Sequence, residues 1–214
     1  MKKGVADILD NLLARHTELA GCRNDLEKAF DLLKQCYENG GKVLICGNGG
    51  SAADSEHIVG ELMKGFLLKR KVGNEIWDKL REAFPSEGEY LADHLQGALP
   101  AISLVSQSAI ASAYINDIAA DLVFAQQVFG YAKVGDVLIG LSTSGNSPNV
   151  LNALKVAKIT GMRSIGLTGS AGGAMAGLCD VTICVPAAET YKIQEYHLPV
   201  YHAICAMLEM EFFG

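Results

Sequence analysis

The sequence predicts an α/β fold in which helices cover both faces of a five-stranded parallel sheet, a three-layer α/β/α arrangement. The chain has 214 residues, half of them hydrophobic, which is enough to bury the core of one domain. Five short apolar runs are separated by stretches that can each hold a helix, as parallel strands require. Two amphipathic segments precede the first run, so we expect residues 1–40 to add helices at the amino terminus.

Each expected element follows from its local pattern. Helices are predicted for Val5–Leu19 and Leu26–Tyr37, where apolar residues recur at helical intervals before Asn39-Gly40-Gly41. The predicted strands are Val43–Cys46, Ala101–Leu104, Val137–Leu141, Ser164–Leu167 and Val181–Val185. Helices between them are expected to begin near Ser51, Ser108, Pro148 and Ala171, and a last helix to run from about Ile193 to Phe212. We predict that all of these belong to one domain, 1–214.

The stretch 67–99 is longer than a usual connection from a helix to a strand. Trp77, Leu80 and Phe84 precede the turn-forming run Pro85-Ser86-Glu87-Gly88, so we expect an inserted helix and loop. One interpretation is that this insertion forms a lid.

Composition narrows the function classes. The formal net charge is −6, and the basic residues are scattered except for Lys69-Arg70-Lys71, which is interpreted as a solvated turn. A nucleic-acid-binding protein is therefore not expected. The six cysteines lack metal-type spacing and are expected to be reduced thiols. No signal-peptide core and no apolar stretch of about twenty residues is found, which predicts a cytoplasmic protein without a membrane segment.

Two loops rich in glycine and hydroxyl side chains follow predicted strands, where open α/β sheets place their ligands. The first is Gly47-Asn48-Gly49-Gly50-Ser51, and the second contains Ser142, Thr143, Ser144 and Ser147 around Gly145, just before Pro148. Hydroxyls, N–H groups and a helix N-terminus suit a phosphate group. Serine and glycine also cap helices, but four hydroxyls within six residues favour an oxyanion site. Neither loop matches a nucleotide-binding motif.

His57 and Glu61 are four residues apart and therefore share one face of the helix after the first loop. Such a pair suits a metal site or acid–base chemistry, although on an arbitrary helix it is more often an exposed pair. The last predicted helix offers Gln194, Glu195, His197 and His202. Spacing alone does not decide whether its histidines are functional or buried in a core or interface, and Pro199 interrupts its hydrogen bonding.

Four motifs in order, "CGNGGSAADSEH", "STSGNSPNV", "GLTG" and "KIQEYH", resemble the sugar isomerase (SIS) domain family, and specifically its phosphoheptose isomerase branch. The resemblance covers the chain apart from 67–99. It implies the SIS fold and an aldose–ketose isomerase that converts sedoheptulose 7-phosphate to D-glycero-D-manno-heptose 7-phosphate through an enediol. It also implies a homotetramer whose active sites lie at subunit contacts, with the amino-terminal helices serving oligomerisation.

The same resemblance implies roles for individual residues. The phosphate would be held by Ser142, Thr143, Ser144 and Ser147, with help from Asn48, Gly49 and Ser51. Zinc would be bound by His57, Glu61, Gln194 and His202, with Gln194 also near the substrate. Glu61 and His202 would serve as acid–base groups, and Asp117 of the Asn116-Asp117 pair would contact the sugar.

Four features depart from the pattern of this branch and leave the substrate open. Gln107 stands where an aspartate is usual, Tyr191 stands where some members have an acidic residue, Pro199 lies in the last helix, and 67–99 is inserted. The alternatives are an isomerase of another phosphosugar and a non-catalytic SIS module, either a sugar-phosphate sensor or a replication-initiator-associating protein. Members of that second class tend to lose the acidic residue at position 61 or the histidine at position 202, and this chain keeps both.

Overall fold

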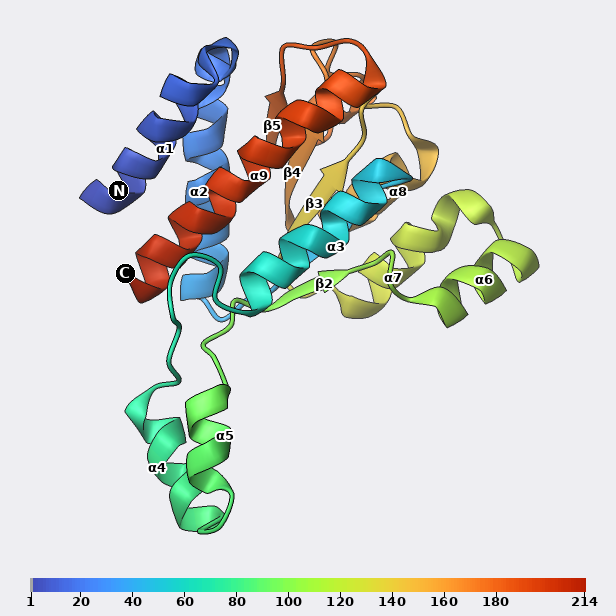
Figure 1. Cartoon of the computed structure of the whole chain (residues 1–214). Coiled ribbons are helices and arrows are strands. Elements are labelled where there is room, and N and C mark those ends of the chain that lie inside the picture. The colour runs from blue at the N-terminus through green and yellow to red at the C-terminus, as the bar shows by residue number, and fades with distance from the viewer. Residues whose placement is uncertain (1) are drawn as a thin grey trace.

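The computed structural model describes residues 2–214 and contains the expected five-stranded parallel sheet (Figure 1). Its strands are β1 (Val43–Cys46), β2 (Ala101–Ser103), β3 (Val137–Leu141), β4 (Arg163–Thr168) and β5 (Val181–Cys184). They are arranged in the order β2-β1-β3-β4-β5, and every neighbouring pair is parallel. The predicted sheet is therefore confirmed, with strand boundaries that differ from the prediction by at most one residue at either end.

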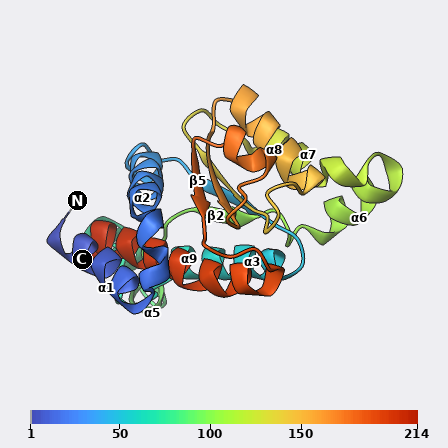
Figure 2. The same cartoon turned by 90° about the horizontal axis from the view of Figure 1, so that it is seen from above.

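Helices cover both faces of the sheet, which confirms the three-layer arrangement (Figure 2). Side chains along β1 alternate between two cores: Val43 and Ile45 pack on one side, Leu44 and Cys46 on the other. The first core contains residues of α1 (Lys3–Arg15), α2 (Arg23–Glu38), α3 (Gly50–Met63) and α9 (Thr190–Phe213). The second contains residues of α7 (Val123–Tyr131) and α8 (Pro148–Ile159). The short 3-10 helix η1 (Thr17–Cys22) joins α1 to α2.

Two connections differ from the expectation. The helix that begins at Ser108 is α6 (Ser108–Asp117), and the short 3-10 helix η2 (Ala120–Leu122) separates it from α7. The prediction of a helix that begins near Ala171 is wrong, because the chain forms only a short 3-10 helix there, η3 (Ala174–Gly177). Gly172 and Gly173 precede that turn with φ angles of +71° and +60°, which a helix cannot contain.

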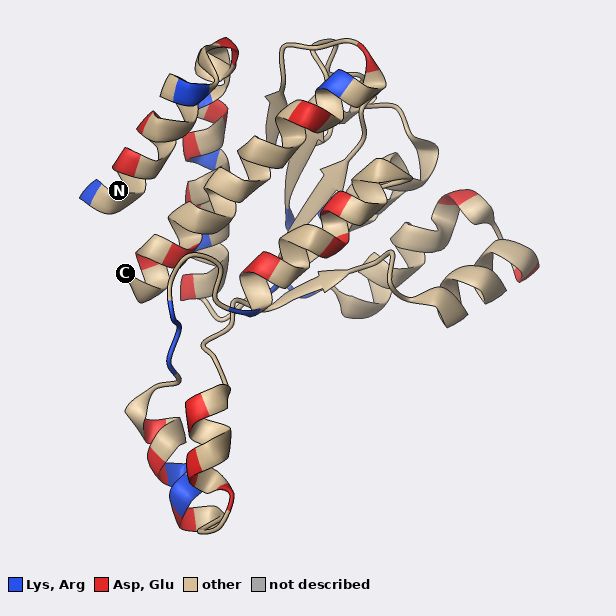
Figure 3. Ribbon diagram, viewed as in Figure 1, with Lys and Arg blue, Asp and Glu red and all other residues tan. Residues whose placement is uncertain are grey.

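The stretch 67–99 forms two helices, not the expected one. Helices α4 (Asn74–Ala83) and α5 (Gly88–His94) pack against each other and project from the body of the domain (Figure 1). We call residues 72–95 the arm; it carries side chains of both charges, as Figure 3 shows. Its two ends meet at a bridge between Lys71 and Gln96. The arm follows the C-terminal end of α3, whereas the serine-rich loops lie toward the N-terminal end, so it does not cover those loops in its own chain.

Basic residues 69–71 do not form a solvated turn as the sequence suggested. Arg70 is only 1% exposed and lies against α9, where it meets Glu209. Among residues 2–214, no helix has both the length and the apolar character that crossing a bilayer requires.

Candidate functional site

The two loops rich in glycine and serine lie beside each other at the carboxyl edge of the sheet. They follow β1 and β3, which are neighbours at the point where the strand order reverses, and open α/β sheets bind ligands at such a point. The side-chain amides of Asn48 and Asn149 exchange two hydrogen bonds of 2.9 and 2.8 Å between them. This pair holds the first loop against the start of α8.

The loop 142–147 is closed by its own side chains. The Oγ atoms of Ser142 and Ser147 are 2.9 Å apart, and Ser142 Oγ also accepts the N–H of Ser147 at 3.4 Å. Thr143 is half-buried and Ser144 is exposed, so the loop has hydroxyl side chains that differ in their exposure to solvent. Gly145 has a φ of +65°, and a Cβ atom there would lie 2.1 Å from the carbonyl oxygen of Gly172. Only glycine fits this position.

Two helix N-termini open at these loops without a side-chain cap. Helix α3 begins after Gly49, which has a φ of +57°, and α8 begins at Pro148 after Ser147. Neither Gly49 nor Ser147 makes a side-chain hydrogen bond to the first turn that follows it. Helix α3 therefore keeps first-turn N–H groups available for an anion. In α8 Pro148 has no N–H and the N–H of Val150 donates to Asn149 Oδ1 at 3.0 Å, which leaves the N–H of Asn149. The dipole of each helix favours negative charge at its N-terminus. Ser51, in the first turn of α3, is buried.

A second group of polar side chains lies where α3 and α9 pack side by side (Figures 1 and 2). His57 Nε2 is 3.1 Å from Glu61 Oε1 and 3.4 Å from His202 Nε2. Glu61 Oε2 is buried and has no hydrogen-bond partner among residues 2–214. Burial lowers the pKa of His202, and the neighbouring His57 adds to this effect. The structure thus brings three of the predicted site residues together.

His57 has a further partner that the sequence analysis did not identify. Tyr201 Oη lies 3.0 Å from His57 Nδ1 and donates a hydrogen bond to Asp54 Oδ1 at 3.2 Å. Burial raises the pKa of the Tyr201 phenol, with Asp54 as the next cause, and burial also raises the pKa of Asp54. Asp54 precedes His57 by three residues on α3, which places both on one face and is the signal that could have indicated this contact.

The other predicted site residues lie apart from this cluster in the single chain. The amide of Gln194 packs against Gly50, where an added Cβ would be 2.5 Å from Gln194 Nε2. Gly50 is seven residues before His57, a distance of about 10 Å along a helix. Asp117 is exposed at the end of α6, where it accepts a hydrogen bond of 2.8 Å from Asn116 Nδ2. Helix α6 packs mainly against η2 and α7, away from α3 and α9.

The donor atoms of His57, Glu61 and His202 are of the kinds that bind zinc, and two of the distances between them approach those between zinc ligands. Two atoms bound to one tetrahedral zinc at about 2.0–2.1 Å lie about 3.3 Å apart, close to the distances here. The buried Glu61 Oε2 is a further oxygen that accepts no hydrogen bond in the described range, with Lys64 Nζ 3.7 Å away. Yet no group of three or more His, Cys, Asp or Glu side chains in the described range already forms a metal site, so binding requires these side chains to adjust.

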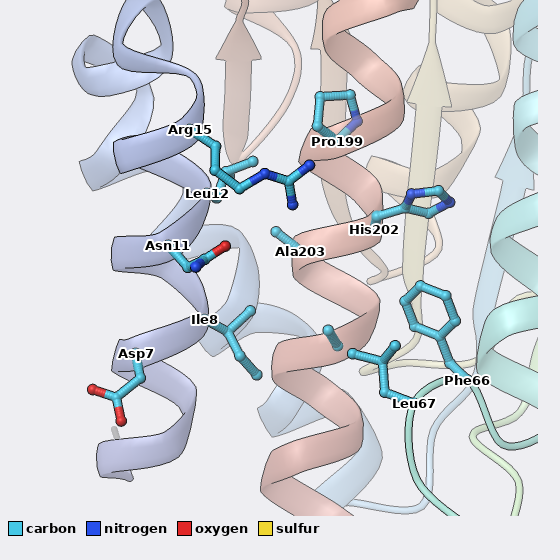
Figure 4. Close-up of a pocket in the computed structure, with 11 residues that line it drawn as sticks. Asp7, Ile8, Asn11, Leu12, Arg15, Phe66, Leu67, Pro199, His202 and Ala203 are labelled. Atoms are coloured by element: carbon cyan, nitrogen blue, oxygen red, sulfur yellow. The ribbon is translucent and has the colours of Figure 1, made fainter.

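A cavity of about 480 Å³ adjoins His202 (Figure 4). It lies between α1 and α9 and is lined mainly by apolar side chains, with Arg15 and Asn11 on α1 and Phe66 beyond α3. The ring of Phe66 is 5.4 Å from the ring of His202. No sequence pattern indicates this cavity, because residues from the beginning, middle and end of the chain line it.

The fold and this site define a doubly wound α/β domain with glycine- and serine-rich loops at the carboxyl edge of its sheet and a cluster of histidine and glutamate side chains on the adjoining helices. A family model described as "SIS domain" matches residues 9–87 and 82–169. The chain therefore belongs to the SIS domain family.

Several relatives of known name match most of the chain. It is 41% identical over 186 residues to the phosphoheptose isomerase of Aliarcobacter butzleri, covering 87% of this chain and 85% of that protein. It is 38% identical over 200 residues to the phosphoheptose isomerase of Campylobacter jejuni, covering 94% and 92%. Its fold matches the structure of phosphoheptose isomerase GmhA from Neisseria gonorrhoeae with a TM-score of 0.65 and 35% identity, covering 92% and 97%. A phosphoheptose isomerase from Francisella tularensis matches with a TM-score of 0.73 and 27% identity, covering 98% and 100%.

Proposed function

We propose that this chain is a phosphoheptose isomerase that interconverts sedoheptulose 7-phosphate and D-glycero-D-manno-heptose 7-phosphate. The observation that carries the proposal is the meeting of His57, Glu61 and His202, about two helical turns from an anion-binding edge. An extended seven-carbon sugar phosphate is of about that length. The names and identities of the relatives support the same reaction.

The phosphate end of the sugar binds at the loops. Ser142, Thr143, Ser144 and Ser147 supply hydroxyl groups, and the N-termini of α3 and α8 supply N–H groups and favourable dipoles. Asn48, Gly49 and Ser51 complete this side of the site. Hydrogen bonds to a charged group are the strong kind, so these contacts orient the sugar as well as hold it.

The carbonyl end of the sugar lies at the helix pair, where Glu61 moves a proton between C1 and C2. Its Oε2 atom accepts no hydrogen bond in the described range, and its nearest cation, Lys64 Nζ, is 3.7 Å away, so this oxygen keeps a lone pair for a proton from carbon. His202 exchanges a proton with the sugar oxygens, and its lowered pKa keeps it neutral at physiological pH, ready to accept. When bound, zinc would act as a Lewis acid that polarises the carbonyl and hydroxyl oxygens.

The zinc ligands in this proposal are His57, Glu61, His202 and Gln194. The first three converge already, whereas Gln194 would have to turn from Gly50 toward them. Asp117 would reach the sugar from a neighbouring subunit of a homotetramer. Exposed apolar side chains near it, Ile115 and Ile118, are 49% and 66% exposed and suit a subunit contact on α6. A role of α1 and α2 in oligomerisation, a single SIS domain over 1–214 and a cytoplasmic location belong to the same proposal.

Turnover of sedoheptulose 7-phosphate by purified protein tests the proposal, with Glu61→Gln as the variant and Glu75→Gln on the exposed arm as the matched control. We expect the wild type and Glu75→Gln to be active and Glu61→Gln to lose at least about 100-fold. Equal turnover by Glu61→Gln would remove Glu61 from the chemistry. A panel of pentose, hexose and heptose phosphates, run with the same proteins, separates an isomerase of another sugar from a protein that binds phosphosugars without converting them.

A further inference from the structure

Asp54, Tyr201 and His57 form a chain of hydrogen bonds between α3 and α9. Tyr201 Oη is 3.2 Å from Asp54 Oδ1 on one side and 3.0 Å from His57 Nδ1 on the other. Tyr201 itself is 2% exposed and belongs to the hydrophobic core, so its ring has one fixed place. The hydroxyl is the polar end of an otherwise apolar side chain, and it is aimed at these two groups.

The chemistry of the three groups determines which atom donates and which accepts in each of these hydrogen bonds. An ionised carboxylate can only accept hydrogen bonds, so the Tyr201 proton lies toward Asp54. The Tyr201 oxygen then accepts from His57, which requires a proton on Nδ1. In a neutral imidazole the other nitrogen, Nε2, is then unprotonated. That nitrogen faces Glu61 Oε1 at 3.1 Å and His202 Nε2 at 3.4 Å. An ionised Glu61 carboxylate can also only accept hydrogen bonds, so without a cation at this point it competes with Tyr201 by favouring a proton on Nε2.

We propose that Asp54 and Tyr201 are positioning residues that hold His57 as its Nδ1–H tautomer and direct the lone pair of Nε2 to the point shared with Glu61 and His202. The inference rests on the proposed metal site, since an electron pair held at that point suits a cation. Metal-binding histidines generally have such a partner on the second ring nitrogen, which fixes tautomer and ring orientation. Here the partner is a phenol that is itself oriented by a carboxylate.

Packing alone would not need the hydroxyl. A phenylalanine at position 201 would keep the ring in the core and the edge-on contact with His57, whose ring centroid is 5.5 Å away. Tyr201→Phe therefore removes one oxygen atom and little else. Asp54→Ala removes the acceptor and leaves the Tyr201 proton free to turn toward His57 Nδ1, which favours the opposite tautomer.

The first measurement is the nitrogen NMR spectrum of the histidine rings in the full-length, metal-free protein at mildly alkaline pH. His57→Gln assigns the His57 signals, and Tyr196→Phe, earlier on the same helix, is the matched control. We expect Nδ1 of His57 to be protonated to the same extent in the wild type and in Tyr196→Phe, against the competing effect of Glu61, which favours Nε2–H. Tyr201→Phe and Asp54→Ala should shift the population toward Nε2–H. A wild-type His57 that carries its proton on Nε2, or variants with the wild-type spectrum, would overturn the proposal.

The second measurement is zinc affinity, determined by competition with a chromogenic chelator. We expect Tyr201→Phe to lose about 10–100-fold in affinity, as is usual when such a partner is removed, and Tyr196→Phe to lose none. Unchanged affinity in Tyr201→Phe would count against the role of the hydroxyl. The NMR measurement of the His57 tautomer needs neither metal nor substrate. Its result can therefore be distinguished from a failure of the proposed isomerase function.

Discussion

Arg70 and Glu209 form an ion pair that is shielded from water on both sides, 139 residues apart in the sequence. Arg70 Nε lies 2.7 Å from Glu209 Oε1, and the side chains are 0% and 1% exposed. Arg70 also donates to the carbonyl oxygens of Glu61 and Leu62 at 2.8 and 2.6 Å. The carboxylate of Glu209 accepts three backbone N–H groups, from residues 66–68. The pair thus joins the end of α3, the base of the arm and α9.

Removing either partner of this ion pair should destabilise the fold strongly. Arg70→Met leaves the Glu209 carboxylate buried without its cation, so we expect the free energy of unfolding to fall by about 3–5 kcal/mol. The double variant Arg70→Met/Glu209→Leu should not recover that loss, because three backbone N–H groups of residues 66–68 and two carbonyl oxygens of α3 would then lack their partners. Chemical denaturation at a fixed protein concentration measures both. A double variant that is more stable than Arg70→Met would contradict this account.

The hydroxyls of the loop 142–147 should govern substrate affinity. Ser142→Ala and Ser147→Ala each remove a hydrogen bond to the proposed phosphate, and one such bond to a charged group is worth about 1.5–3 kcal/mol. We expect KM for the sugar phosphate to rise by about 10–100-fold, with a smaller change in kcat. Ser86→Ala at the turn of the arm is the control. An unchanged KM in both loop variants would place the phosphate elsewhere.

Gly145→Ala should disable the same loop through its backbone. The residue has a φ of +65°, and the added Cβ would meet Gly172 at 2.1 Å. We expect a loss of stability of at least about 1 kcal/mol and weakened phosphosugar binding. The matched control is Gly130→Ala on α7, where an added Cβ has no atom within 4 Å and alanine favours the helix. Thermal unfolding with and without sugar phosphate distinguishes the two, and equal behaviour would disprove the close approach.

His197 should make the protein sensitive to acid. Burial lowers its pKa to about 4, and neither ring nitrogen has a hydrogen-bond partner among residues 2–214. The unfolded chain takes up a proton at an ordinary pKa near 6.5, so it binds more protons than the folded chain between pH 6.5 and 4. Stability should therefore fall by up to about 3 kcal/mol as the pH falls through that window. His197→Leu should flatten this part of the profile, and a slope unchanged by that substitution would assign it to other groups.

Much of the fold could be predicted because its signals are local. Each strand is an apolar run between turn residues, and the glycine-rich loops mark the ends of two of the strands. The second helix of the arm and the separation of α6 from α7 were missed, since their boundaries depend on tertiary packing. Arg70 was misjudged for the same reason: nothing near residues 69–71 indicates a carboxylate that arrives from the far end of the chain.

Part of the candidate site could also be predicted from local signals. The spacing of His57 and Glu61 on one helix indicates that they are neighbours, and the density of hydroxyl side chains in 142–147 indicates an anion-binding loop. That His202 lies 3.4 Å from His57 depends on the packing of α3 against α9, which spacing alone does not reveal. The role of Tyr201 is harder still to predict, because a tyrosine in an apolar helix is usually a core residue. Only the position of its hydroxyl beside Asp54 in the structure indicates a further role.

The closed base of the arm makes residues 72–95 a separable module. The backbone leaves the domain at Lys71 and returns beside it at Gln96, and Gly97 N–H donates to the Arg70 carbonyl at 2.7 Å. Whatever length of chain lies beyond that bridge, neither Arg70 nor β2 has to move. The arm can therefore change in length or sequence during evolution without a change in the rest of the domain. A tag or a binding peptide could be inserted at the same point.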